Sequence, residues 1–404
     1  MILEINYIIP TILTLFPKQI LMQFCIFEII INLYFSFPKK MLHFKSHWFL
    51  LFFFLSLSNF AQEIADSTDA SLPYTKSGTI KLDSAKIRSK HNDLKTANKF
   101  YSDAIKDFKK AIKVNPNAYT PYYYLGIAQS KTGDYKTAVT SFTKALFIDS
   151  TIGDAFRERG LAQAALGRDK EALSDFNKAL DKNIEDAESF YQRGMLKAKN
   201  KDVNSAMDDY AQALELKPNF EDIYLKRGIL FYTLKKDYVL ALIDFNSLLE
   251  RNPENNEGYL WRGKTKFNGY DYKGADKDLS RYLDFEPENV DALITRGAAR
   301  LTLNDNSNAV RDFDEAIKLD PKNFIAYMNR GTAKGAMKNF TGALEDLDMA
   351  IELKFNYSSA YINRAAVKFA SGDKKGACKD LEKADGLNNE KAYDLIKKYC
   401  KEYQ

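Results

Sequence analysis

The sequence predicts an all-α solenoid, an array of stacked helix-turn-helix repeats that ends in a C-terminal capping helix. A small residue recurs every 34 or 35 residues, an alanine follows it after 12 or 13 residues, and an aromatic residue or leucine follows four residues later. Only 10 Pro and 19 Gly occur among 404 residues, which favours helices over turn-rich β structure. This fixed period overrides the two or three domains that length alone suggests.

Eight small residues, here called the anchors, set the phase of the repeat. They are Gly126, Gly160, Gly194, Gly228, Gly263, Gly297, Gly331 and Ala365. The recurring alanines are Ala138, Ala172, Ala206, Ala241, Ala275, Ala309, Ala343 and Ala377. Only small side chains let two helix backbones approach closely, so we expect each anchor on a first helix to face the recurring alanine on the second.

Two larger columns keep the same phase. Four residues before the anchors stand Tyr122, Phe156, Phe190, Tyr224, Tyr259, Leu293, Tyr327 and Tyr361. Four residues after the recurring alanines stand Phe142, Phe176, Tyr210, Phe245, Leu279, Phe313, Leu347 and Leu381. We expect these side chains to fill the space between hairpins. The extra residue of the longer repeat falls among residues 235–238, which we expect to form a turn, where insertion is cheap.

A degenerate unit precedes the eight clear repeats. Its second helix is marked by Tyr101, Ala104, Phe108, Ala111 and Pro116, and we expect its first helix near residues 85–97. Several clear repeats close with a proline, which cannot continue a helix: Pro218, Pro253, Pro287 and Pro321.

These columns resemble the tetratricopeptide repeat family over residues 85–391. The nearest match is the set Tyr122, Leu125, Gly126, Ala138, Phe142 and Ala145. The chain differs from the family where Arg mostly replaces the Leu before the anchor, and where Lys or another residue often replaces the Tyr three residues after it. The resemblance implies a right-handed superhelix whose first helices line a concave groove for a protein or peptide. The Lys/Asn pattern of the family's chaperone-tail clamps is not reproduced, so that specificity is not implied.

Mapping the groove by position gives eight candidates for contact with a partner. They are Tyr123, Arg157, Tyr191, Lys226, Trp261, Lys264, Asn329 and Asn363. Trp and Tyr in a groove are good anchors for a partner. The alternative for each residue is plain solvated surface.

Arginine precedes the anchor in seven consecutive repeats, and an aspartate follows 16 or 17 residues after each arginine. The pairs are Arg159 with Asp175, Arg193 with Asp209, Arg227 with Asp244, Arg262 with Asp278, Arg296 with Asp312, Arg330 with Asp346, and Arg364 with Asp380. The first clear repeat lacks both, having Leu125 and Ser141. This joint presence and absence predicts structural ion pairs, partly buried, between the two helices of one hairpin. A stripe that binds anions is the alternative.

The N-terminal part differs from the repeats. Residues 41–61 have the order of a secretory signal peptide, with Lys45, an apolar run from Trp48 to Leu55, and Ala61 before the expected cut. For residues 1–40, a hydrophobic extension, two interpretations are open: a start codon assigned too early, or a membrane segment. Residues 62–84 are polar and predict a flexible linker. We therefore expect an exported protein, periplasmic or associated with the cell envelope, that contacts membrane only through an uncleaved N-terminal segment.

Few residues could carry chemistry. After Ala61 the sequence contains one histidine, His91, and two cysteines, Cys378 and Cys400. It contains no metal-ligand spacing, no glycine-rich phosphate loop and no nucleophile elbow. We expect neither catalysis nor a cofactor. The net charge of +5 is spread among interleaved acids and bases, which argues against nucleic acid as a partner.

The C-terminal residues 389–404 predict the capping helix, with Ala392, Leu395, Ile396 and Tyr399 on one face. Cys378 and Cys400 lie on what we expect to be antiparallel neighbours. Export favours a disulfide between them, and two buried thiols are the alternative.

Overall fold

The structure, a computed structural model, describes residues 69–402, and within these residues the chain forms helices and no strand. The all-α prediction is confirmed. The predictions for residues 1–40, for residues 41–61 and for the start of the linker lie outside the described residues. Among those described, no helix is both long and apolar enough to cross a bilayer.

The chain divides into two compact units, one up to Pro121 and one from Tyr122. The described part of the first unit is one hairpin, α4 (Leu72–Lys90) and α5 (Leu94–Val114), followed by the start of α6 (Tyr119–Lys131). This corrects two expectations. The predicted linker at 62–84 is helical from Leu72, and the first helix of the degenerate unit is α4, not a segment near 85–97. A Cβ on Gly78 would lie 2.5 Å from the Phe108 ring, so Gly78 is its anchor.

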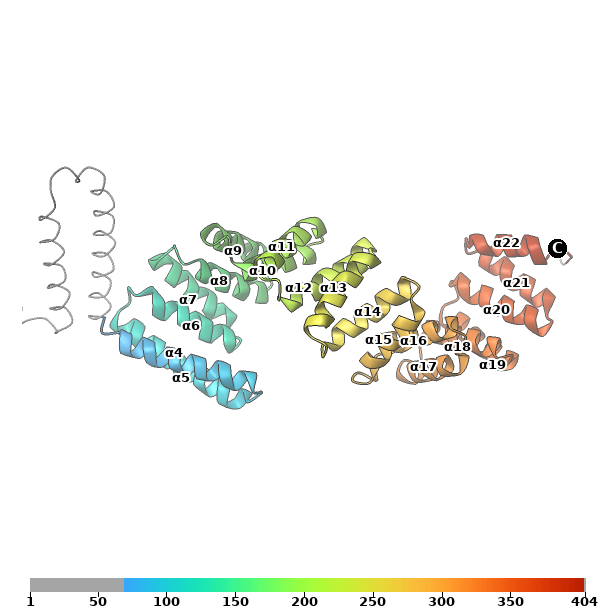
Figure 1. The fold of residues 1–404 in the computed structure, drawn as a ribbon, viewed down its shortest axis with the longest axis horizontal. Coiled ribbons are helices and arrows are strands. Elements are labelled where there is room, and N and C mark those ends of the chain that lie inside the picture. The colour runs from blue at the N-terminus through green and yellow to red at the C-terminus, as the bar shows by residue number, and fades with distance from the viewer. Residues whose placement is uncertain (1–68, 403–404) are drawn as a thin grey trace, which may run out of the picture. The chain divides into compact units, whose positions relative to one another are not determined.

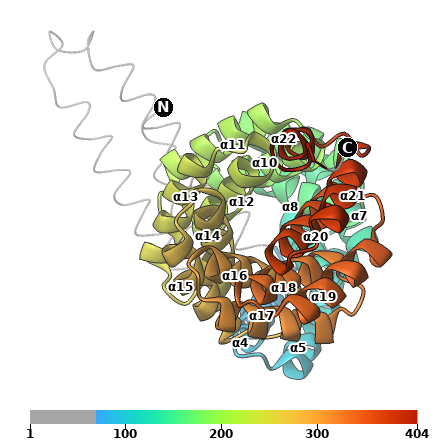
Figure 2. The same cartoon turned by 90° about the vertical axis from the view of Figure 1, so that its right-hand side faces the viewer.

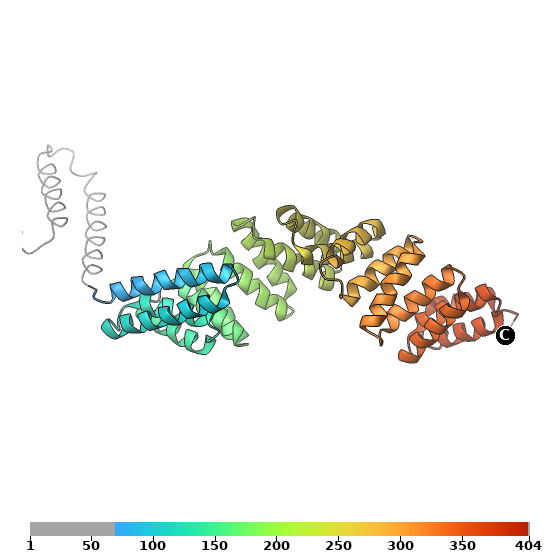
Figure 3. The ribbon, with the colours of Figure 1, turned by 90° about the horizontal axis from the view of Figure 1, so that it is seen from below.

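The second unit contains α6 from Tyr122 and sixteen further α-helices among the described residues, which pair into hairpins up to the last helix, α22 (Figures 1 and 3). Their bounds are α7 (Tyr135–Ile148), α8 (Gly153–Ala165), α9 (Asp169–Lys182), α10 (Ala187–Lys199), α11 (Val203–Leu216), α12 (Glu221–Leu230), α13 (Tyr238–Arg251), α14 (Asn256–Asn268), α15 (Tyr272–Leu283), α16 (Val290–Thr302), α17 (Asn306–Leu319), α18 (Phe324–Ala336), α19 (Phe340–Leu353), α20 (Ser358–Ser371), α21 (Lys374–Asp385) and α22 (Glu390–Tyr399). The second helix of each hairpin packs on the first helix of the next.

The turn inside each hairpin of the second unit follows one pattern. A residue with positive φ ends the first helix: Gly133, Gly167, Lys201, Lys236, Tyr270, Asn304, Lys338 or Gly372. In most hairpins an Asp or Asn then caps the second helix, as where the Asp271 carboxylate accepts a hydrogen bond from the Gly274 backbone N–H at 2.9 Å. This cap satisfies a backbone donor that the helix itself leaves unpaired.

The extra residue of the 35-residue repeat is absorbed by a helix rather than by the turn. Phe231–Lys235 form a π-helical turn, η2, at the end of α12, and Lys236 still takes the positive-φ position before the cap Asp237. The expectation of an insertion in the loop was wrong. Because the turn geometry is kept, the additional residue widens the last helical turn instead.

The anchor glycines face mainly the phenylalanine, tyrosine or leucine that follows four residues after the recurring alanine, which corrects the expected contact with the alanine itself. A Cβ added to Gly297 would lie 2.7 Å from Cε1 of Phe313, and one added to Gly228 would lie 2.7 Å from Cε1 of Phe245. The ring therefore occupies the volume that the missing side chain leaves open. The one alanine anchor, Ala365, lies in a buried cluster with Ala377 and Leu381.

Gly297→Ala is therefore expected to destabilise the hairpin of α16 and α17. Overpacking a core costs about 1–3 kcal/mol, whereas the gain in helix propensity is at most about 1 kcal/mol. Thermal unfolding followed by circular dichroism should show a lower midpoint. The double variant Gly297→Ala/Phe313→Leu recreates the pair Ala365 and Leu381 and should recover part of the loss. A Gly297→Ala midpoint equal to that of the wild type would contradict the contact.

The helix α22 closes the C-terminal end of the second unit. Ala392 is buried, and Ile396 is buried beside Ala377 and Leu381 of α21. A disulfide joins Cys378 of α21 to Cys400, the residue that follows α22. The cap is thus held by apolar burial and by a covalent link.

Candidate functional site

The first helices lie on the inner side of the second unit. Figure 2 shows α12, α14, α16 and α20 nearer its centre than α13, α15 and α21. The first helices of consecutive hairpins also contact one another, α14 with α16, α16 with α18, and α18 with α20. We call this side the inner face, and the side formed by the second helices the outer face.

Two predicted contact residues belong to the core. Tyr191 is 7% exposed and packs with Tyr210 and Phe220, and burial raises the pKa of its hydroxyl to about 12. Tyr123 packs against Phe142, and burial raises the pKa of the Tyr123 hydroxyl above its ordinary value. Tyr191 is closed to a partner, so assigning it to the groove was wrong. Tyr123 is only partly buried, so its assignment to the groove stays a prediction.

Arg157 lies on the inner face but is already paired. Its Nη1 is 2.7 Å from Asp154 and 2.9 Å from Asp186, and its Nη2 is 3.6 Å from Glu158. Burial disfavours the charged guanidinium, but attraction to Asp186 outweighs it and raises the pKa of Arg157. Glu158, in contrast, has its pKa raised by burial. This cluster locks Arg157 in place.

Trp261 and Lys264 form one cluster with Tyr232, a residue that the sequence analysis missed. Lys264 Nζ is 4.8 Å from the Trp261 ring and 6.0 Å from the Tyr232 ring, and 2.5 Å from the carboxylate of Asp291. The two rings meet edge to face at 5.4 Å. Tyr232 belongs to η2, so the π-helical turn supplies one wall of the cluster. The result is a rigid aromatic surface on the inner face.

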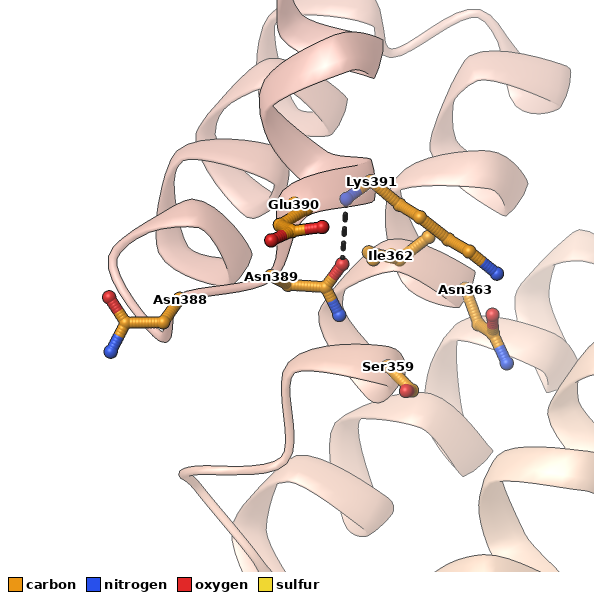
Figure 4. A pocket seen from close by; sticks show the side chains of 7 residues that line it. All are labelled: Ser359, Ile362, Asn363, Asn388, Asn389, Glu390 and Lys391. Atoms are coloured by element: carbon orange, nitrogen blue, oxygen red, sulfur yellow. Dashed lines mark hydrogen bonds between the residues drawn. The ribbon is translucent and has the colours of Figure 1, made fainter.

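Three predicted residues remain open to a partner. Lys226 and Asn329 are partly exposed, and their side chains make no hydrogen bond or ion pair with any described residue. Asn363 donates to Thr332 Oγ1 at 3.1 Å. It also lines an open hollow of about 470 Å3 between α20 and the start of α22, together with Ser359, Ile362 and residues 388–391 (Figure 4). These polar groups and the aromatic cluster make the half of the unit from α12 to α22 the best candidate for binding.

The arginine–aspartate pairs lie within the hairpins, as two-point contacts. In all seven, Arg Nε and Nη2 donate to the two carboxylate oxygens at 2.6 to 3.1 Å. The aspartates are nearly inaccessible, with Asp312 and Asp346 each 4% exposed. Because the carboxylate neutralises each guanidinium, the geometry favours structural ion pairs over a stripe that binds anions.

Two further contacts of these pairs escaped the sequence analysis. A second cation three residues after the anchor shares the aspartate in five repeats: Lys197, Lys266, Arg300, Lys334 and Lys368. In addition, Arg Nη1 donates to the second helix of the preceding hairpin, as from Arg330 to Asp314 at 2.6 Å. Similar acceptors are Thr143, Asn177, Asn246, Ser280 and Asp348. Six of the seven arginines therefore tie one hairpin to the next.

We call this series of arginine–aspartate pairs and their links to the preceding hairpin the polar ladder. The polar ladder is interrupted at one hairpin. Arg227 pairs with Asp244, but the position of the preceding acceptor holds Ala211, and Phe231 replaces the second cation. Burial raises the pKa of Asp244, although the hydrogen bond from Arg227 and its positive charge act to lower it. The hairpin of α12 and α13 is therefore the one that differs most from the rest of the array.

The described residues contain no group of three or more His, Cys, Asp or Glu side chains that could hold a metal ion.

A repeated hairpin with a glycine anchor, an aromatic residue opposite it and the next hairpin stacked on it defines an α-solenoid of 34-residue repeats. Profiles of the tetratricopeptide repeat match residues 108–140, 187–220, and 131–187 with 294–373. The chain is a tetratricopeptide repeat protein, as the resemblance indicated. Repeats of this family build scaffolds for protein interactions.

Several solved structures are similar to parts of this chain. PilF of Pseudomonas aeruginosa is 16% identical, with a TM-score of 0.47 over 55% of this chain and 96% of PilF. A tetratricopeptide repeat protein of Parabacteroides merdae is 20% identical, with a TM-score of 0.37 over 70% of this chain and 96% of that one. MamA is 23% identical, with a TM-score of 0.37 over 40% of this chain and 94% of MamA. A search of curated proteins gives no match.

Proposed function

We propose that the protein is a non-catalytic scaffold that holds a peptide or a protein partner against the inner face of its second unit, outside the cytoplasm. The observation that carries this proposal is the row of inner-face groups on consecutive first helices. Lys226 lies on α12, Trp261 on α14, Asn329 on α18 and Asn363 on α20. Each hairpin adds a small patch, so affinity accumulates along the array.

The chemistry of this row fits an extended segment with both polar and apolar side chains. Lys226 and Asn329 have hydrogen-bonding capacity that no described residue uses, and Trp261 and Tyr232 offer rigid apolar area. Aromatic anchors of this kind carry much of the energy in protein interfaces. The location outside the cytoplasm is supported by the signal-like residues 41–61 and by the Cys378–Cys400 disulfide, since disulfides persist in oxidising compartments.

Trp261→Ala is expected to lower the affinity for the partner by roughly thirtyfold or more, since truncating a hot spot costs about 2 kcal/mol or more. The measurement is affinity capture from the envelope fraction, followed by mass spectrometry and titration of the captured partner. Asn329→Arg tests the same face without removing an internal contact, and it should weaken capture as well. Arg311→Glu, on the outer helix α17, is the matched control and should leave capture unchanged.

The alternative is a structural subunit of a periplasmic or outer-membrane assembly, docking through its outer face or an edge. Capture that survives both inner-face variants would contradict the groove proposal and favour this second function. The N-terminal residue of the captured protein gives an independent result. A start near Gln62 supports cleavage and export, whereas retention of residues 41–61 indicates an anchor.

A further inference from the structure

The outer face of α13 exposes three large apolar side chains. Val239 is 70% exposed, Leu240 40% and Ile243 54%. They stand at i, i+1 and i+4 of one helix, so they form one continuous strip, while Ala241, Asp244 and Phe245 of the same helix are buried in the hairpin. We call Val239, Leu240 and Ile243 the α13 strip.

The repeat itself does not require the α13 strip. In the other hairpins, the position of Val239 holds Ser102, Lys136, Lys170, Asn204, Lys273, Ser307, Thr341 and Lys375. The position of Leu240 holds Asp103, Thr137, Glu171, Ser205, Gly274, Asn308, Gly342 and Gly376. The position of Ile243 holds Lys106, Thr140, Ser174, Asp208, Lys277, Arg311, Glu345 and Lys379. Since all 24 are polar or glycine, core packing does not explain the strip, and a clustered apolar surface of this kind points to an interaction site.

Exposed lysines stand just before the α13 strip in the chain and at the equivalent positions of the next second helix, α15. Lys273 and Lys277 occupy in α15 the two positions that Val239 and Ile243 occupy in α13, and both are exposed without an ion pair to any described residue. Lys235 and Lys236 are exposed just before the start of α13. Lys235 donates only to the neutral Asn204, and Lys236 lies over the Tyr232 ring. Two acidic residues are also present, Asp237 at the N-cap of α13 and Asp208 at the Ile243 position of α11. The four lysines, here called the lysine border, therefore leave an excess of positive charge.

We propose that the α13 strip and its lysine border form a second docking site, which takes an amphipathic helix of a partner protein whose apolar face is flanked by acidic residues. Burial of the three apolar side chains supplies affinity, and the lysines select the charge of the flanks. A second copy of this chain fits poorly, because pairing strip with strip would bring like charges together. The site lies on the outer face and does not depend on the inner-face function proposed above.

The test is selection from a library of helical peptides with leucines at i, i+3, i+4 and i+7 and randomised flanking positions. Wild-type protein is the bait, and Val239→Lys/Ile243→Lys is the counter-bait. Peptides retained by the wild type should carry Asp or Glu in the flanks and should bind the double variant about tenfold more weakly or worse. Lys273→Glu/Lys277→Glu should weaken the same peptides and reduce the salt dependence of binding.

The matched control is Thr341→Lys/Glu345→Lys, which places lysines at the equivalent positions of α19 and should leave binding unchanged. All these substitutions lie on the surface, so circular dichroism should show unchanged folding. The proposal is overturned if no peptide is retained, if both baits retain the same peptides, or if the flanks are basic. It is also overturned if the strip instead binds phosphatidylserine vesicles, or if the wild type forms oligomers that the strip variant disperses. Loss of inner-face capture in Trp261→Ala has no bearing on these outcomes.

Discussion

Asp312→Ala is expected to lower the free energy of unfolding by about 3–5 kcal/mol, the cost of leaving a buried partner charge uncompensated. Asp312 is 4% exposed and accepts hydrogen bonds from Arg296 at 2.7 and 3.1 Å and from Arg300 at 2.9 Å. Its removal leaves two cations without their shared carboxylate. Unfolding in urea, followed by circular dichroism, should show a clear fall in midpoint.

The matched control is Glu315→Ala on the same helix, α17. Glu315 is partly exposed and pairs only with the exposed Lys318, one turn away, so its removal should leave the midpoint nearly unchanged. Asp244→Ala gives a further comparison, because Asp244 pairs with Arg227 alone and should cost less than Asp312→Ala. If Asp312→Ala behaved like Glu315→Ala, the ladder would contribute no stability.

Removing the disulfide is expected to weaken the docking of α22 by about 3 kcal/mol, the chain-entropy value for a closed loop of this length. The bond links residues separated by 22 positions and holds a short helix whose buried residues are Ala392 and Ile396. In Cys378→Ser/Cys400→Ser, hydrogen exchange of the α22 amides should accelerate by roughly a hundredfold. Because each hairpin contacts only its neighbours, amides of α16 should keep their protection.

The double serine variant avoids a free thiol that could react elsewhere. Reduction of the wild type with dithiothreitol should reproduce its exchange pattern, and reoxidation should reverse it. Unchanged protection of α22 in both cases would mean that burial of its apolar face alone fixes the cap.

The repeat, the hairpins and the pairing of Arg with Asp could be predicted because each is a column with a fixed spacing. The residue that each anchor glycine contacts could not be predicted in this way. Ala309 and Phe313 lie one helical turn apart on the same face of α17, so spacing alone does not tell which of them meets Gly297. Likewise, the spacing shows one additional residue, which we expected among residues 235–238, but only the structure shows that the helical turn at Phe231–Lys235 absorbs it.

The burial of Tyr191 and the packing of Tyr123 against the core had a signal in the sequence. Tyr123 and Tyr191 stand three residues before the anchor, a position that otherwise holds Arg157, Leu225, Leu260, Ile294, Met328 and Ile362. Such a mostly apolar column is typical of a core position. The position two residues before the anchor holds Tyr124, Glu158, Gln192, Lys226, Trp261, Thr295, Asn329 and Asn363. This mostly polar column contains the residues that the structure leaves open on the inner face.

The most direct test of partner binding on the inner face is photo-crosslinking in the intact cell envelope. A benzophenone amino acid is placed at position 329, on the inner helix α18, or at position 311, on the outer helix α17. The proposed function predicts a crosslinked partner from position 329 and none from position 311. A partner crosslinked from position 311 alone would contradict it.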